Sequence, residues 1–221
     1  MLFLAVSLGF LVENQREHYI ERQRAKVLAY SLVEDLRKDT SMLNSTIKRC
    51  DEKVKSLKEL VRLLREPNTP GNDTLIYRHS VLIQFATRFL RAGGTYTQIV
   101  NSGSLRYFKQ SLINLMIQYD IDVRMVESRR DADLNIIFSE SLNFVNKYLN
   151  QEVYDEILEN KPITKSPYFR FDSQETVNEL INYAIVSRRI TERMKLECET
   201  ALSSGIKLIT ALTKKYGDGG G

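Results

Sequence analysis

The sequence from residue 36 to residue 65, LRKDTSMLNSTIKRCDEKVKSLKELVRLLR, decides the fold class. After one interval of seven, its apolar residues alternate between intervals of four and three, the heptad pattern of a helix that packs along one seam. Charged residues occupy most positions between them, which is typical of the solvent-facing side of such a helix. The predicted helix-packing seam consists of Leu36, Leu43, Ile47, Cys50, Val54, Leu57, Val61 and Leu64.

The helix that carries this seam is expected to be long. Residues 66–73, EPNTPGND, contain two prolines and a glycine, so we expect the helix to end at about Arg65. In the other direction no helix breaker separates the seam from residues 13–26, ENQREHYIERQRAK. One helix is therefore predicted from an N-terminal apolar run to about Arg65.

The apolar run itself, residues 1–12, reads MLFLAVSLGFLV and has no charged side chain. As a helix it covers roughly 18 Å, less than the ~30 Å hydrocarbon core of a bilayer. The run lacks the basic residues with which a signal peptide begins. A core helix also fits poorly, because the run is apolar on every side. We favour the distal part of a transmembrane helix, with these membrane-embedded residues: Leu2, Phe3, Leu4, Val6, Leu8, Phe10 and Leu11.

Two shorter helices are predicted next in the chain. The first covers about Thr74 to Arg91 and ends at Gly93-Gly94. The second opens at Thr95, because Thr95-Tyr96-Thr97-Gln98 fits a capping box, and it closes near Ser102-Gly103. A glycine pair before a helix can also hold an anion, but the glycines are more simply explained as a helix end.

The second half of the chain is predicted to be helical as well. Residues 105–149 form one long helix or two helices with a break at about 129–133. Residues 161–171, KPITKSPYFRF, form a loop, and Asp172 with Glu175 starts a final helix that runs to about Tyr216. One face of that helix is small and partly polar, so it either packs closely or borders a wet cleft, and close packing is the simpler interpretation. It consists of Val177, Leu180, Ala184, Ser187, Thr191, Met194, Cys198, Ala201 and Leu208.

These elements predict an all-α protein, an elongated antiparallel helical bundle whose long N-terminal helix continues from a transmembrane segment. The chain has 221 residues, of which 43% are hydrophobic and 27% charged, so it can bury a real core. The predicted domains are residues 1–12 in the membrane, residues 13–216 as the bundle and residues 217–221 as a flexible tail.

We find no pattern of catalytic, cofactor-binding or metal-binding residues. His18 and His79 have no metal-spaced neighbours, and acidic pairs such as Glu34-Asp35 are expected to be solvated. The net charge is +4, but acidic and basic residues alternate, so nucleic acid is not expected as a partner. Lys214-Lys215 are interpreted as solvated helix surface. We therefore expect a protein that is not an enzyme and binds no cofactor.

Two cysteines, Cys50 and Cys198, are far apart in the sequence and have no Cys-x-x-Cys spacing. Two buried free thiols are the simpler interpretation, and a disulfide between the first and last helices is the alternative.

Two stretches together resemble one known family. The first is residues 28–40, LAYSLVEDLRKDT, which follow the apolar run and Glu13-Asn14-Gln15-Arg16-Glu17. They resemble the post-membrane helix of an uncharacterised family of small single-pass inner-membrane proteins of Bacteroidota. Residues 95–106, TYTQIVNSGSLR, resemble the second signature of that family. The resemblance implies one transmembrane helix and a periplasmic helical domain, with no assigned activity.

Three functions are compatible with these patterns. The first is a structural or accessory subunit that is anchored in the bilayer and braces other membrane or periplasmic subunits, or a second copy of itself. The second is a periplasmic ligand-sensing bundle that signals through its membrane helix. The third is a hydrolase of unfamiliar type, which needs a buried carboxylate or histidine in a cleft. The continuous helix and the lack of catalytic motifs favour the first.

Overall fold

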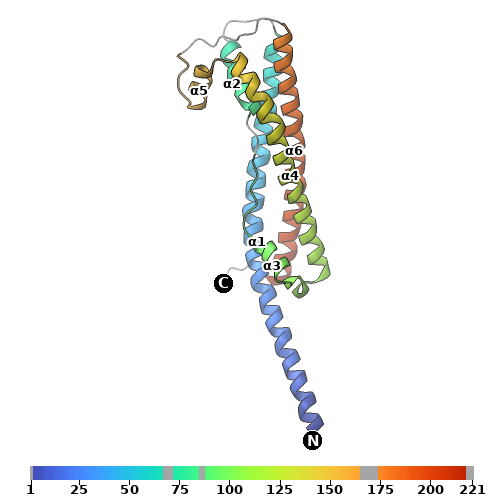
Figure 1. Cartoon of the computed structure of the whole chain (residues 1–221). Helices are drawn as coiled ribbons and strands as arrows, with labels where there is room; N and C mark the ends of the chain where they lie inside the picture. Colours follow the sequence, from blue (N-terminus) through green and yellow to red (C-terminus); the bar gives the residue numbers. More distant parts are fainter. Residues whose placement is uncertain (1, 67–71, 85–87, 165–173, 218–221) are drawn as a thin grey trace. The chain divides into compact units, whose positions relative to one another are not determined.

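The computed structural model describes residues 2–66, 72–84, 88–164 and 174–217; for residues 2–8, 10, 84, 132–141 and 145 it describes the backbone only. Every regular element in these ranges is helical (Figure 1), which confirms the all-α class and the long N-terminal helix. In chain order the elements are α1 (Leu2–Arg65), α2 (Asn72–Gln84), α3 (Thr95–Asn101), the 3-10 helix η1 (Ser104–Tyr107), α4 (Gln110–Tyr148), α5 (Gln151–Leu158) and α6 (Gln174–Tyr216).

The chain divides into two compact units. Unit 1 comprises Met1–Met42, Leu90–Val123 and Ala201–Gly221, and unit 2 comprises Leu43–Phe89 and Arg124–Thr200. The three long helices α1, α4 and α6 each contribute to both units.

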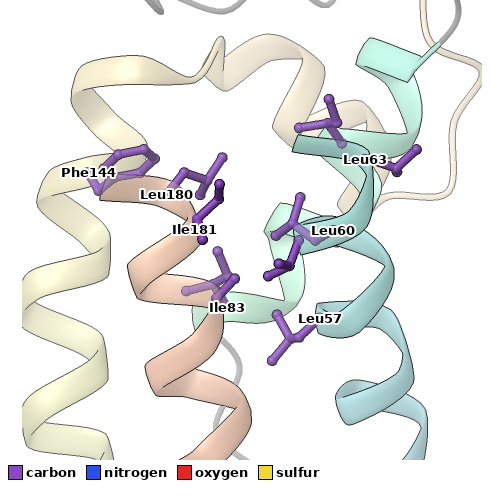
Figure 2. Packing of buried hydrophobic residues seen from close by; sticks show 10 residues of the cluster. Leu57, Leu60, Leu63, Ile83, Phe144, Leu180 and Ile181 are labelled. Atoms are coloured by element: carbon purple, nitrogen blue, oxygen red, sulfur yellow. The ribbon is translucent and has the colours of Figure 1, made fainter. Parts of the chain in front are cut away.

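Unit 2 is held by an apolar core to which four helices contribute. Figure 2 shows Leu57, Leu60 and Leu63 of α1 with Ile83 of α2, Phe144 of α4, and Leu180 and Ile181 of α6. Leu57, Leu60 and Leu180 are completely buried. Each such leucine contributes about 1.5–3 kcal/mol relative to an exposed position, so this cluster accounts for much of the stability of the unit.

A second apolar cluster of unit 2 joins α2 to α5. It contains Tyr77 and Val81 of α2 with Leu149, Val153 and Tyr154. The backbone N–H of Asn150 donates a hydrogen bond to the Tyr77 hydroxyl at 2.8 Å, and the Asn150 side chain caps α5 by accepting from the N–H of Glu152. Helix α5 is not among the predicted elements, although an asparagine before an amphipathic segment is a recognised helix start.

In unit 1, α1 and α6 run antiparallel and approach closely. The Tyr30 hydroxyl of α1 donates to the carbonyl of Tyr216 at 2.8 Å, whereas a Cβ at Gly205 would lie 3.1 Å from both Thr40 and Tyr119. A larger residue at position 205 would push the helices apart. This agrees with the expected close packing along α6, where every residue of the predicted face is buried except the half-buried Val177.

Several predicted boundaries are confirmed. Helix α1 ends at Arg65 and α6 at Tyr216. Residues 110–148 form one continuous helix, which decides between the two alternatives for this segment. Asp172, the predicted cap of α6, lies outside the described residues.

The predicted helix from Thr74 to Arg91 is wrong in its second half. Helix α2 ends at Gln84, and residues 88–93 are not helical. In unit 2 the Arg88 carbonyl accepts from Thr46 and Arg49, and the Phe89 carbonyl accepts from Arg130. Side chains from other helices thus replace the helical backbone partners that this segment would otherwise need.

The capping box predicted at Thr95 is also wrong. Helix α3 does begin at Thr95 and end at Asn101, but the N-cap is Gly94 and no side chain of the segment caps it. Instead, the Thr95 N–H and hydroxyl donate to Oδ2 of Asp35 on α1, at 3.2 and 2.6 Å. The anion at this helix start is therefore a carboxylate of the protein itself.

Candidate functional site

The residues predicted to be membrane-embedded lie at the start of α1. The side chains of Leu2, Phe3, Leu4, Val6, Leu8 and Phe10 lie outside the described residues. Leu11 is described and is 60% exposed, as is its neighbour Val12 at 65%. Among the described residues, no helix combines the length and the hydropathy that a membrane crossing needs.

The next stretch of α1 makes few contacts. From Leu11 to Arg24 no side chain is buried, and Ala25 is the first buried residue that follows this stretch. This stretch is about 20 Å long at the helical rise of ~1.5 Å per residue. Figure 1 shows this stretch (blue) extending beyond α3 and beyond the C-terminal end of α6, which also belong to unit 1.

The predicted helix-packing seam lies on the inner side of α1. Leu36, Leu43 and Leu57 are fully buried and Val61 nearly so, whereas Ile47, Val54 and Leu64 are half-buried. The buried stripe is wider than the apolar pattern, because it also includes polar residues spaced by seven: Asp39, Thr46 and Lys53. Hydropathy periodicity misses these positions, although their heptad spacing is visible in the sequence.

In unit 1, Asp39 belongs to a cluster of side chains that holds the segment between α2 and α3. We call it the Asp35–Asp39 latch; it consists of Asp35, Asp39, Met42, Tyr119 and Asp120 together with residues 90–95. Asp39, only 1% exposed, accepts from the Ala92 N–H and from the Tyr119 hydroxyl, the latter at 2.7 Å. The Leu90 N–H points at the sulfur of Met42 at 3.4 Å. One side chain on each successive turn of α1 therefore binds the backbone of residues 90–95.

Arg91 anchors the same segment to α4. Its guanidinium donates to Oδ1 of Asp120 at 2.6 Å, and both side chains are largely buried. It also lies 5.3 Å from the ring centre of Tyr96 and 5.7 Å from that of Tyr119. A cation between two aromatic rings with a carboxylate partner is a favourable environment for a partly buried arginine.

Burial raises the pKa of Asp39 above its ordinary value, and the hydrogen bonds from Ala92 and Tyr119, together with the charge of Arg91, counteract only part of that effect. The neighbouring carboxylate of Asp35 adds to the rise. Asp39 therefore takes up a proton more readily than an aspartate with the ordinary pKa.

Glycine is required at position 93, where residues 90–95 come closest to Asp35 of α1. Its φ of +67° favours glycine, and a Cβ there would lie 2.0 Å from a carboxylate oxygen of Asp35. Asp35 was expected to be a solvated surface acid, which is wrong: it is half-buried and binds Thr95. The two stretches that carry the family resemblance, residues 28–40 and 95–106, therefore meet through these contacts.

Unit 2 also contains a buried carboxylate, that of Glu197 on α6. It accepts from Arg129 of α4 at 3.1 Å and from Arg193 one helical turn away at 3.1 Å. The two guanidinium groups compensate the buried charge. Like the latch, this arrangement joins separate segments of the chain, here α4 and α6.

The two cysteines of unit 2, Cys50 in α1 and Cys198 in α6, are buried thiols that form no disulfide. Burial raises the pKa of the Cys198 thiol to about 12, and the charges of Cys50, Glu197 and Glu199 contribute further. The thiol of Cys198 therefore stays protonated at neutral pH, which makes it a poor nucleophile and metal ligand.

The histidine of unit 2, His79, forms a hydrogen bond with Ser56, and burial lowers the pKa of its imidazole. Within the described residues, no three histidine, cysteine or acidic side chains are grouped as a metal site would require. Comparison of the chain with models of known protein families, with curated proteins and with solved structures found no significant match.

Proposed function

We propose that the chain is a membrane-anchored accessory subunit that braces a partner at the bacterial inner membrane, with its helical part in the periplasm. In this proposal residues 1–12 are the distal part of a transmembrane helix, and α1, α4 and α6 form an antiparallel bundle. The observation that carries it is the course of α1, which runs from the apolar residues through an exposed stretch, residues 11–24, into a buried core without interruption.

The contacts of the buried polar groups favour bracing over catalysis. The carboxylates of Asp39, Asp120 and Glu197 each bind donors from a different segment of the chain. Such networks fix the position of helices and connecting segments, and they engage these three carboxylates in contacts between segments. The resemblance to the Bacteroidota inner-membrane family supports the periplasmic location, and the exposed stretch offers a surface for the partner.

Membrane attachment is tested by extracting membranes of expressing bacteria with alkaline carbonate. We expect the wild-type chain to remain in the membrane and the Leu4→Arg/Leu8→Arg variant to be released, because arginine is costly in hydrocarbon. The matched control is Gln15→Arg/Gln23→Arg, which adds the same charge to the exposed stretch and should behave like wild type. Release of all three proteins alike would contradict the attachment.

Partner binding is tested separately by photo-crosslinking in native membranes. A crosslinking amino acid at position 19, where Tyr19 is 63% exposed, should give one adduct of defined mass. The same amino acid at position 196, where Leu196 of α6 is 52% exposed, serves as the control. If position 19 gives no adduct, or gives the same products as position 196, the exposed stretch does not bind a partner.

A further inference from the structure

One end of unit 1 carries basic residues from three separate segments. The basic end, as we call it, consists of Arg22, Arg24 and Lys26 on α1, Arg106 and Lys109 around η1, and Lys214 and Lys215 in the last turn of α6, all exposed. No aspartate or glutamate occurs in residues 22–33, 95–119 or 203–217. The sequence alternates charges over most of its length, so this asymmetry appears only when the three segments are brought together.

Contacts within unit 1 show that these segments lie together. The Tyr30 hydroxyl of α1 binds the carbonyl of Tyr216, and the ring of Phe108 packs edge-on against that of Tyr216 at 6.1 Å. The guanidinium groups of Arg106 and Arg24 lower the pKa of the Tyr107 hydroxyl, so η1 also lies beside α1. Figure 1 shows α3 and the end of α6 beside α1 where its N-terminal part begins to extend beyond them.

We infer that the basic end of unit 1 binds an anionic lipid surface. This inference rests on the proposed attachment through residues 1–12, which places the bilayer on the same side. From Val12 to Arg22 the helix covers about 15 Å, of which the headgroup region takes about 5–7 Å. At Arg22 the remaining distance is comparable to the Debye length of ~8 Å at physiological salt, so the side chains of the basic end nearest the bilayer feel its surface charge.

The segment between the apolar run and the basic end has a different charge pattern. Glu13, Glu17 and Glu21 alternate with Arg16 and His18, and two of these acids pair within the helix, Glu13 with Arg16 at 3.7 Å and Glu21 with His18 at 3.6 Å. Glu21 also contributes to raising the pKa of Arg106. Attraction to lipid therefore comes from the basic end and not from this segment.

The test measures binding of the full chain to vesicles of phosphatidylcholine alone and of phosphatidylcholine with phosphatidylglycerol. The Arg106→Gln/Lys109→Gln/Lys214→Gln/Lys215→Gln variant removes four charges of the basic end and leaves α1 unchanged. The control, Lys48→Gln/Lys55→Gln/Lys58→Gln/Arg65→Gln, removes four exposed charges of unit 2, one of them also in the last turn of a helix. Circular dichroism checks that both variants keep the helical content of wild type.

We expect wild type and the control to prefer the anionic vesicles and the basic-end variant to lose this preference. Each basic residue near an anionic surface changes affinity about fivefold, so loss of even two contacts weakens binding about 25-fold. The preference should also shrink between ~0.1 and ~1 M salt, where the Debye length falls from about 10 to about 3 Å. Equal loss in both variants, or no preference in wild type, would overturn the inference.

The same measurement separates this inference from the proposed attachment when Leu4→Arg/Leu8→Arg is included. Salt-resistant binding of wild type to neutral vesicles without anionic preference supports the anchor and overturns the lipid inference. If the Leu4→Arg/Leu8→Arg variant binds only anionic vesicles, and binds them in a salt-sensitive way, the lipid inference is supported whether or not residues 1–12 anchor the chain. Displacement by inorganic phosphate at matched ionic strength, or equally tight binding of a DNA duplex through the same four residues, would assign the basic end to another ligand.

Discussion

Unit 2 and unit 1 both contain parts of the same three long helices, α1, α4 and α6. They differ in the interactions that hold the segments between these helices. In unit 2 the apolar cluster around Leu57, Leu60 and Leu180 joins α1, α2, α4 and α6. In unit 1 the non-helical segment before α3 is bound to α1 and α4 by the carboxylates of Asp39 and Asp120. Apolar contacts stabilise without direction, whereas each hydrogen bond fixes one backbone position. We expect unit 2 to depend on volume and unit 1 on geometry and charge.

The largest effect is expected in the apolar core of unit 2. Leu180→Ala leaves a cavity among fully buried side chains and should lower the free energy of unfolding by about 2–5 kcal/mol. Urea denaturation followed by circular dichroism measures it. Leu196→Ala, at a 52% exposed position of the same helix, should change it by less than about 0.5 kcal/mol. Similar losses of unfolding free energy in both variants would show that burial in the apolar core does not determine the stability of unit 2.

A backbone substitution tests the geometry of unit 1. Gly93→Ala incurs about 1–2 kcal/mol for the left-handed conformation, and displacing Asp35 adds about 1–3 kcal/mol for the lost hydrogen bonds. Gly103→Ala is the matched control, because Gly103 has the same φ of +67° but no atom within 4 Å of the added Cβ. Equal destabilisation of the two variants would show that Asp35 does not bind the segment tightly.

Two ion pairs of nearly equal length compare the units directly. Arg91 and Asp120 of unit 1 lie 2.6 Å apart with side chains 19% and 11% exposed, and Lys195 and Asp51 of unit 2 lie 2.7 Å apart at 30% and 56%. Arg91→Gln should cost about 1–3 kcal/mol, since it removes the cation beside a mostly buried carboxylate. Lys195→Gln should cost about 0–1 kcal/mol and become neutral in high salt. A larger effect of Lys195→Gln would reverse the comparison.

The smallest effect concerns pH. Because folding raises the pKa of Asp39 above 3.8, the folded state holds this proton more tightly, and stability from this group falls as pH rises from 3.8 through the raised value. Asp39→Asn keeps the shape without the charge. The unfolding free energy of wild type minus that of Asp39→Asn should therefore decrease over this pH range and then level off. A difference that rises with pH would mean that the pKa is lowered instead.

Much of the fold could be predicted because it depends on local patterns. The seam residues Leu36 and Leu57, the end of α1 at Arg65 and the buried face of α6 follow from periodicity and from breakers within a few residues. Other assignments stay predictions, among them the embedded residues of α1 and a single bundle domain over residues 13–216.

The latch could not be predicted in the same way. Asp39 looks like a surface acid because the groups that compensate its burial, the Ala92 N–H and the Tyr119 hydroxyl, are 53 and 80 residues away in the sequence. Likewise, residues 88–91 fit a helical pattern in the sequence. In the structure, side chains of Thr46, Arg49 and Arg130 donate hydrogen bonds to backbone carbonyls of this segment instead.

The sequence by itself therefore determined where most helices begin and end and which apolar faces they bury, since helix formation and amphipathicity depend on residues three or four positions apart. Only the tertiary structure decided that Asp39, Thr46 and Lys53 are buried, that residues 88–93 are not helical, and that seven basic residues share one end of unit 1. The physical reason is that burying a polar group, or concentrating charge, depends on partners that folding brings from distant parts of the chain.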